Sequence, residues 1–278
     1  MLDDKGIKQV IDFVKKEPRT VQDVSKLIGR SWVTTDSYLG KIKESTGLIA
    51  IKTFRKGTQG ALKIVYHTST EASKSDELKT ILSNQIMNGR SKEDFDFMEI
   101  FQFIDDKKKK AFVDIAKENV TSKKANFVNL LSSASDKVYI FSGNLSFINL
   151  KEGNKKTIDI IEDLLKRKVM IKIICRVNMA SLLNINKLNK LMIKYQGLIE
   201  IKHSYQPLRG LIVDNNIARF KDEEQVQSYK KGELDKNQVI FYETYDEEWI
   251  LWLQNVFWGM FRNAISAESR INEINQVF

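Results

Sequence analysis

Hydrophobic residues in the first 47 positions recur every three or four residues, which is the spacing of an amphipathic helix. The pattern breaks at Pro18, Gly29 and Gly47, and proline and glycine are residues that commonly end helices. Thr20 and Asp23 have the spacing of a capping box at the start of the middle segment. The pattern therefore predicts three consecutive helices, over residues 7–16, 20–29 and 31–47.

The period of the hydrophobic residues changes after Gly47. The runs LIAIKTF, 48–54, and LKIVYHT, 62–68, are strand-like and flank a polar turn that contains glycine, which predicts a β-hairpin. Three helices followed by a hairpin form the arrangement of a winged helix-turn-helix. We therefore expect a winged-helix domain over residues 1–70.

The next segment, residues 71–119, is polar and helical in pattern and is predicted to be a helical linker. It carries one apolar stripe, which either packs on the following domain or forms part of a dimer interface. The lysine run at 107–110 is interpreted as the solvated face of a helix, with a phosphate contact as the alternative. The stripe consists of Phe95, Met98, Phe101 and Ile104.

From residue 120 to residue 278 strand-like and helical patterns alternate. This alternation favours a mixed sheet flanked by helices, so the whole chain is predicted to be an α+β protein of two domains. The strand-like runs are 137–143, 169–176, 198–205 and 238–245, and the helical runs are 155–168 and 179–197. The final aromatic segment, 249–265, contains Gln254, Asn255 and Arg262, so it is predicted to be a buried helix and not a membrane span.

Charge is concentrated in the predicted winged helix. The chain carries a net +9, and residues 1–70 hold 13 Lys and Arg against 7 Asp and Glu, a local +6. Such a basic excess favours a polyanionic partner, here double-stranded DNA, although winged helices also serve as protein-interaction modules.

The third helix is expected to enter the major groove with Leu39 and Ile42 facing inward. Trp32 is interpreted as a core residue and not as a side chain that stacks on DNA. The residues predicted to contact DNA or to flank the contact are Arg30, Ser31, Thr34, Thr35, Ser37, Tyr38 and Lys41 on the helix, and Lys52, Arg55, Lys56 and Gln59 on the wing.

Several kinds of site are disfavoured by composition. One cysteine and two histidines provide neither a disulfide framework nor a zinc site, and Cys175 lies in an apolar run typical of a buried thiol. The acids at Asp214 and 222–224 are interpreted as a solvated loop, so no metal and no cofactor are predicted. The charged N-terminus has no apolar signal region, from which we expect a cytoplasmic, nucleoid-associated protein with no membrane partner.

The stretch PLRGLIVDN, 207–215, resembles the H-x-K-x-x-x-x-D motif of the phospholipase D superfamily. Pro207 stands at the histidine position, Arg209 at the lysine position, and Asp214 at the aspartate position. The resemblance implies loss of catalysis, because the family's histidine is the nucleophile and proline cannot replace it. His203 lies in a strand-like run and is expected to have a structural or surface role, and His67 ends the predicted wing, so no pair of cooperating histidines is expected. Arg209 and Asp214 could pair with each other or hold an anion without cleaving it.

A winged helix joined to such a degenerate domain is similar to archaeal TrmB-type transcriptional regulators. The resemblance implies a homodimeric DNA-binding regulator whose second domain serves dimerisation or the response to an effector, either a small molecule or a protein. Two alternatives remain: a sequence-tolerant architectural protein of the nucleoid, and a divergent nuclease or phosphodiesterase.

Overall fold

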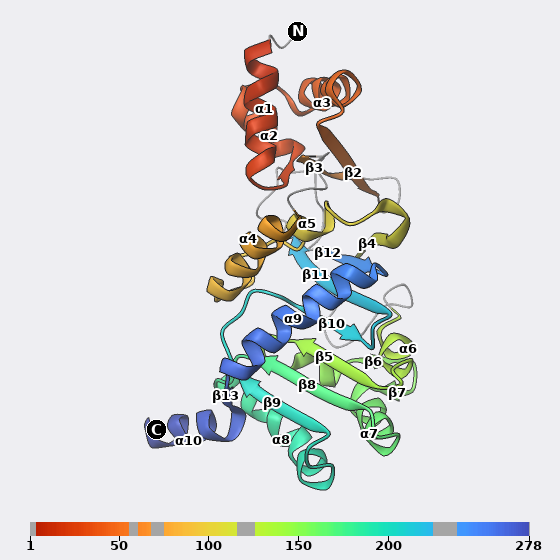
Figure 1. The fold of residues 1–278 in the computed structure, drawn as a ribbon, viewed down its shortest axis with the longest axis vertical. Coiled ribbons are helices and arrows are strands. Elements are labelled where there is room, and N and C mark those ends of the chain that lie inside the picture. Colours follow the sequence, from red (N-terminus) through yellow and green to blue (C-terminus); the bar gives the residue numbers. More distant parts are fainter. Residues whose placement is uncertain (1–3, 56–60, 68–74, 116–125, 225–237, 278) are drawn as a thin grey trace.

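A computed structural model describes residues 4–55, 61–67, 75–115, 126–224 and 238–277 (Figure 1). A small unit of three helices and a three-stranded sheet is followed by an α/β unit built on an eight-stranded sheet. The predicted α+β arrangement, a winged helix followed by an α/β domain with a mixed sheet, is therefore confirmed.

The N-terminal unit contains α1 (Asp4–Lys16), α2 (Val21–Ile28) and α3 (Trp32–Thr46). Its sheet has the order β1-β3-β2, with β1 at Arg19–Thr20, β2 at Ile49–Arg55 and β3 at Ala61–His67. All pairs in this sheet are antiparallel. The three helices pack on one face of the sheet around a small core of Val10, Val14, Val21, Val24, Leu39, Ile42, Ile49 and Val65.

The β2–β3 hairpin is buried on both of its faces. Ile49 and Val65 point toward the three helices, whereas Phe54, Ile64 and Tyr66 belong to the main core of the α/β unit. Side chains alternate between the two faces of a strand, so one hairpin supplies apolar groups to two cores. The winged helix is thereby packed directly on the α/β unit.

Residues 75–115 pass from one unit to the other through α4 (Ser75–Asn88), α5 (Met98–Phe101), a 3-10 helix (Asp106–Lys108) and β4 (Lys109–Ile115). The stripe of Phe95, Met98, Phe101 and Ile104 is at most 4% exposed and lies in the main core. The Phe101 ring is 5.0 Å from the ring of Tyr242. The stripe therefore packs within its own chain, and its interpretation as a dimer interface is wrong.

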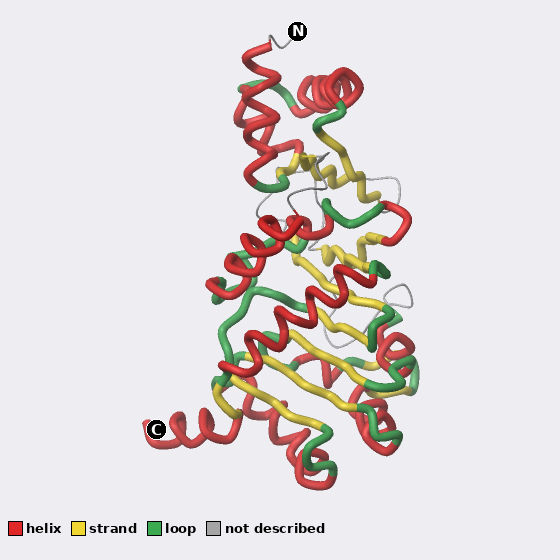
Figure 2. The backbone as a smooth tube through the Cα atoms, in the orientation of Figure 1, coloured by secondary structure: helices red, strands yellow, loops and turns green. Residues whose placement is uncertain are grey.

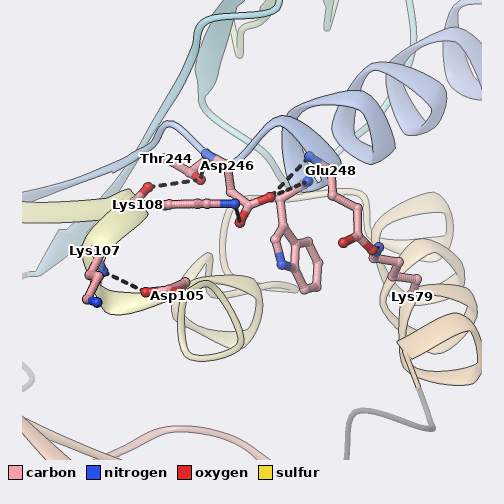
Figure 3. Close-up of polar contacts among 8 residues, drawn as sticks. Lys79, Asp105, Lys107, Lys108, Thr244, Asp246 and Glu248 are labelled. Atoms are coloured by element: carbon pink, nitrogen blue, oxygen red, sulfur yellow. Dashed lines mark hydrogen bonds and ion pairs between the residues drawn. The ribbon is translucent and has the colours of Figure 1, made fainter.

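The lysine run is a solvated helix face only in part, because Lys107 and Lys108 are exposed on a helical turn whereas Lys109 lies in a strand with its side chain buried. Lys107 and Lys108 lie in the 3-10 helix, where the Asp105 carboxylate accepts the Lys107 N–H at 2.8 Å, and the Lys108 Nζ is 3.2 Å from the Asp246 carboxylate (Figure 3). Lys109 begins β4, and its nearly buried ammonium donates to a backbone carbonyl at 3.1 Å. The range expected to be a linker thus holds an edge strand of the main sheet, because its backbone pairs with β12.

The eight-stranded sheet, whose strands are yellow in Figure 2 and labelled in Figure 1, has the order β13-β9-β8-β5-β10-β11-β12-β4. Only β5, β8 and β9 run parallel to one another, and the remaining neighbours are antiparallel. The strand bounds are β5 Lys137–Phe141, β8 Met170–Cys175, β9 Ile199–His203, β10 Gly210–Val213, β11 Ile217–Glu224, β12 Gln238–Thr244 and β13 Ile265–Ser266, with a separate hairpin of β6 Lys151–Glu152 and β7 Lys155–Lys156.

Helices cover both faces of this sheet (Figure 1). The long helix α9 crosses one face, where its Phe257 ring stacks on Tyr139 at 4.8 Å. The helices on the opposite face enclose a second core around Ile171 and Leu188. The helix bounds are α6 Phe127–Ser132, α7 Thr157–Lys166, α8 Met179–Lys194, α9 Glu247–Asn263 and α10 Ala267–Val277, with a 3-10 helix at Ser146–Asn149.

Helix α9 corresponds to the aromatic segment of the sequence. Asp246 caps its N-terminus by accepting the Glu248 N–H at 3.0 Å, and Trp249, Leu253 and Phe257 are buried. The prediction of a buried helix is confirmed. Among the described residues, none of the helices combines the length and the apolar character needed to cross a membrane.

The shared hairpin predicts that the two units unfold together. Replacing Phe54, which is 5% exposed, by alanine removes a ring from the main core and should lower the free energy of unfolding by about 3–5 kcal/mol. We expect a single urea transition for both proteins, followed by circular dichroism and tryptophan fluorescence. Two separate transitions in the wild type would contradict the coupling, and Val33→Ala, at an exposed position, is the matched control.

Candidate nucleic-acid interface

Helix α3 begins and ends where its sequence provides caps. The Ser31 hydroxyl accepts the Thr34 N–H at 3.2 Å, and Gly47 adopts a left-handed conformation with φ of 64°. The turn before α3 is fixed by Ser25, whose hydroxyl donates to the Arg30 carbonyl at 2.6 Å. Gly29 adopts a left-handed conformation with φ of 63°, which permits the tight turn from α2 to α3.

One face of α3 forms part of the winged-helix core. Thr35, Leu39 and Ile42 are at most 2% exposed, and the Thr35 hydroxyl donates to the Ser31 carbonyl at 2.9 Å. The expectation that Thr35 faces outward is therefore wrong. Threonine fits this apolar position because its hydroxyl is satisfied by the helix backbone.

The opposite face of α3 is open. Ser37 and Lys41 are exposed there, Thr34 and Tyr38 are half-exposed at its border, and Arg30 and Ser31 are exposed in the turn before it. The helix lies at the end of the molecule away from the eight-stranded sheet (Figure 1). The structure thus gathers six of the seven residues predicted for the turn and the helix around one accessible surface.

Asp36 is the acid closest to the start of this surface. Both of its carboxylate oxygens accept from the Lys63 ammonium, at 2.7 and 2.6 Å. The same ammonium lies 5.3 Å from the centre of the Trp32 ring, which is half-buried against the small core. The negative charge of Asp36 is thereby neutralised, and Trp32 has the structural role that the sequence predicted.

The wing residues are placed differently from the helix residues. Lys52 shares its strand face with Ala50 and Phe54, which pack toward the α/β unit, and it lies close enough to Lys109 to lower the pKa of that ammonium further, after burial. Lys52 therefore lies on the face of β2 that points away from α3, because side chains alternate along a strand, and its expected contact with DNA from the wing stays a prediction. Arg55 is the last residue of β2, and Lys56 and Gln59 lie outside the described residues.

The degenerate motif lies at the turn into β10 and along that strand. Pro207 is buried and packs against the backbone at the end of α4, since a Cβ placed on Gly89 would lie 2.8 Å from the proline Cγ. Arg209 donates to the carbonyls of Gln206 and Leu208 at 3.0 and 2.7 Å. Burial lowers the pKa of the Arg209 guanidinium, and the neighbouring Arg176 lowers it further.

Asp214 does not pair with Arg209. The two residues flank the four-residue strand β10, which separates them by roughly 16 Å. The Asp214 carboxylate instead accepts the backbone N–H groups of Ser135, Asp136 and Lys137 at 2.9 to 3.0 Å. Burial alone would raise the pKa of Asp214, but these hydrogen bonds outweigh it and lower the pKa. The aspartate therefore ties the β10–β11 turn to the start of β5.

The two histidines lie in different sheets. His67 ends β3, whereas His203 ends β9, where its Nδ1 accepts the Val177 N–H at 2.9 Å. Burial lowers the pKa of His203, and Arg270 lowers it further, so the ring is neutral at pH 7. Burial also raises the pKa of the Cys175 thiol to about 12, which keeps it protonated. These side chains form no nucleophile–base pair.

The acids at 222–224 are not a solvated loop, since they extend β11. Asp222 accepts the Phe97 N–H at 3.1 Å, and Glu223 pairs with Lys92 at 2.8 Å. Burial and the adjacent Asp96 raise the pKa of Asp222 well above its ordinary value. Within the described part of the chain, no group of three or more metal-ligating side chains is close enough to hold an ion.

Two residues on the open face of α3 were missed because only polar side chains were considered. Val33 is 73% exposed, and a Cβ added to Gly40 would have no heavy atom within 4 Å. Their signal in the sequence was the helical period, which places both residues opposite Leu39 and Ile42.

No protein-family model and no curated protein matches the sequence. Among solved structures, TrmBL2, described as an archaeal chromatin protein with a novel mode of DNA binding, is 12% identical, with a TM-score of 0.42 over 94% of this chain and 92% of that chain. Nuc from Salmonella typhimurium, a phospholipase D family member, is 14% identical, with a TM-score of 0.39 over 57% and 97% of the two chains. NucT from Helicobacter pylori is 15% identical, with a TM-score of 0.39 over 57% and 99%.

The position of Asp214 predicts a pH-dependent contribution to stability. Asp214→Asn leaves part of the Ser135–Lys137 backbone without an acceptor and should lower the free energy of unfolding at pH 7 by about 1–3 kcal/mol. Because the folded pKa is lowered, the wild-type advantage is complete above the unfolded pKa of about 3.9 and is lost as the pH falls through the folded pKa.

Urea denaturation between pH 7 and pH 3 measures this difference. Asp163→Asn, at an exposed carboxylate, is the matched control and should change stability little at any pH. A constant gap between wild type and Asp214→Asn across the whole range would contradict the assignment.

Proposed function

We propose that this protein binds double-stranded DNA by inserting the open face of α3 into the major groove. The observation that carries the proposal is the surface of α3 itself, which offers hydroxyl groups and cations opposite a face fixed in the core. Side chains of this kind donate to phosphate oxygens and to base edges. The local +6 charge of residues 1–70 supplies the electrostatic attraction.

The two described cations of this surface have separate roles in the proposal. Arg30 precedes the helix and is exposed, so it reaches the phosphates beside the groove, whereas Lys41 projects from the open face two turns into α3. Asp36, the acid nearest the start of the helix, does not oppose them, because Lys63 neutralises it. The start of α3 is therefore the part of the helix best suited to lie against DNA.

The α/β unit is proposed to position the winged helix and to serve dimerisation or the response to an effector, without catalysis. Its motif residues already have structural partners: Pro207 packs on Gly89, Arg209 binds backbone carbonyls, and Asp214 binds backbone N–H groups. A homodimer would present two α3 helices to successive major grooves, about 34 Å apart. We propose a transcriptional regulator of the nucleoid; uniform genome-wide occupancy would favour an architectural protein instead.

Binding to duplex DNA should weaken steeply with salt. Between about 50 and 200 mM salt, each phosphate contact contributes roughly one unit to the slope of log affinity against log salt. Lys41→Ala should reduce that slope by about 1 and lower affinity by about tenfold. Fluorescence anisotropy with a labelled 30-base-pair duplex measures both quantities. Lys190→Ala, an exposed lysine on α8, is the control, and an equal loss in both variants would show that α3 is not the contact.

We further expect no hydrolysis of phosphodiesters. Pro207 provides no nucleophile, and His67 and His203 lie in different sheets, so the covalent step available to an intact motif is absent. Wild type and Arg209→Ala are incubated with plasmid DNA and with a chromogenic phosphodiester, with and without divalent cations. Turnover by the wild type that disappears in the variant would establish an enzyme and refute this part of the proposal.

A further inference from the structure

The face of α3 that lies directly opposite the core is narrow and small in side-chain volume. Val33, Ser37 and Gly40 are spaced by four and three residues, so they lie in one row along the helix. Val33 is 73% exposed, Ser37 is exposed, and Gly40 has open space where a side chain would project. This row lies opposite Leu39 and Ile42 on the helix, and Glu44 continues it toward the C-terminus.

The small size of the row determines how closely the helix can approach DNA. Gly40 presents no side chain and Ser37 only a hydroxymethyl group, so the α3 backbone can lie near the floor of a major groove. Glycine inside a helix costs about 1 kcal/mol relative to alanine, and no heavy atom of the described residues lies within 4 Å of a Cβ placed on Gly40. The open space at this position is therefore accessible to an external partner.

The distribution of charge along the row indicates which end of α3 lies deepest in the major groove. Glu44 is exposed on the same side near the C-terminus of the helix, where its carboxylate is repelled by phosphates. The acid nearest the N-terminus, Asp36, is neutralised by Lys63. The first turn, which carries Val33, is therefore the end that approaches the bases.

An exposed valine at this place matches one chemical feature of the groove. The C5-methyl group of thymine is the apolar group on the major-groove edges of the bases, whereas the other groups there are hydrogen-bond donors and acceptors. Since the Val33 side chain makes no contribution to the core and offers only methyl groups, it can lose water favourably only against another apolar surface.

We propose that Val33 contacts the C5-methyl group of thymine in the major groove and makes α3 selective for thymine at that base pair. This inference rests on the proposed binding of DNA through α3. It adds a specificity-determining residue to the interface and identifies the base that this residue recognises.

The test compares duplexes that differ only in the thymine methyl groups. A mixed pool of 30-base-pair duplexes is synthesised with thymine or with uracil, which pairs identically but lacks the C5-methyl group. Affinities for both pools are measured for wild type, Val33→Ala, Val33→Thr and Leu183→Ala. Leu183, which is 74% exposed on α8, is the matched apolar control outside the interface.

Wild type should bind the thymine pool about fourfold more tightly than the uracil pool, as expected for burial of one methyl group. Val33→Ala should reduce this ratio toward 1, because it removes both γ-methyl groups, whereas Val33→Thr, which keeps one γ-methyl group, and Leu183→Ala should retain it. An undiminished ratio in Val33→Ala, or an equal affinity of the wild type for both pools, would overturn the role of Val33 and leave DNA binding intact. Wild type that binds neither pool would refute the proposed function itself.

Discussion

The burial of the β2–β3 hairpin on both faces holds the two units of this protein together. Val65 lies among the winged-helix side chains, while its neighbours Ile64 and Tyr66 lie in the main core of the α/β unit. Side chains on one face of the hairpin stabilise the winged helix by burial, and those on the other face stabilise the α/β unit. The backbone pairs between β2 and β3 hold the two faces in one rigid hairpin. The winged helix is consequently packed on the α/β core and does not move independently of it.

This constraint also orients the surface of α3. Lys63, on β3, binds Asp36 on the helix, so the hairpin that enters the main core also holds the helix proposed to read DNA. A change in the packing of α5 or β12 around Tyr66 and Phe101 would displace the hairpin and, through Lys63, the helix. A movement of the α/β unit against the hairpin would therefore shift the open face of α3 through the contact between Lys63 and Asp36.

Local sequence period predicted much of this fold. The spacing of Leu39 and Ile42 fixed the inner face of α3, and the alternation of strand and helix indicated the α/β unit. Thr35 was misplaced because its polarity suggested solvent, although a helix carbonyl satisfies its hydroxyl. The strand at Lys109 was missed because it is stabilised by pairing with distant residues of β12, which no local pattern reveals.

The candidate site shows the same division. From the sequence, Pro207 is predicted to stand where the family has its nucleophile, and the structure adds that Asp214 binds backbone N–H groups at the start of β5. The hydrogen-bond donors are backbone N–H groups nearly 80 residues away in the sequence. Every residue except proline has such a group, so the amino-acid sequence does not indicate which of them Asp214 binds. Conversely, the helical spacing places Val33 and Gly40 on the open face of α3, but neither has a polar side chain that would mark it as a DNA contact.

The strand β4 has a consequence for the synthesis of the chain. Its residues pair with β12 residues that lie 123 to 135 positions later in the sequence. At a ribosomal rate of about 5–20 residues per second, roughly 6 to 27 seconds pass between the emergence of the two strands. Throughout that interval the main core lacks β12 and α9, so the Phe54 and Tyr66 side of the nascent winged helix is only partly covered. The growing polypeptide therefore exposes an aggregation-prone apolar face, which is the kind of surface that chaperones cover.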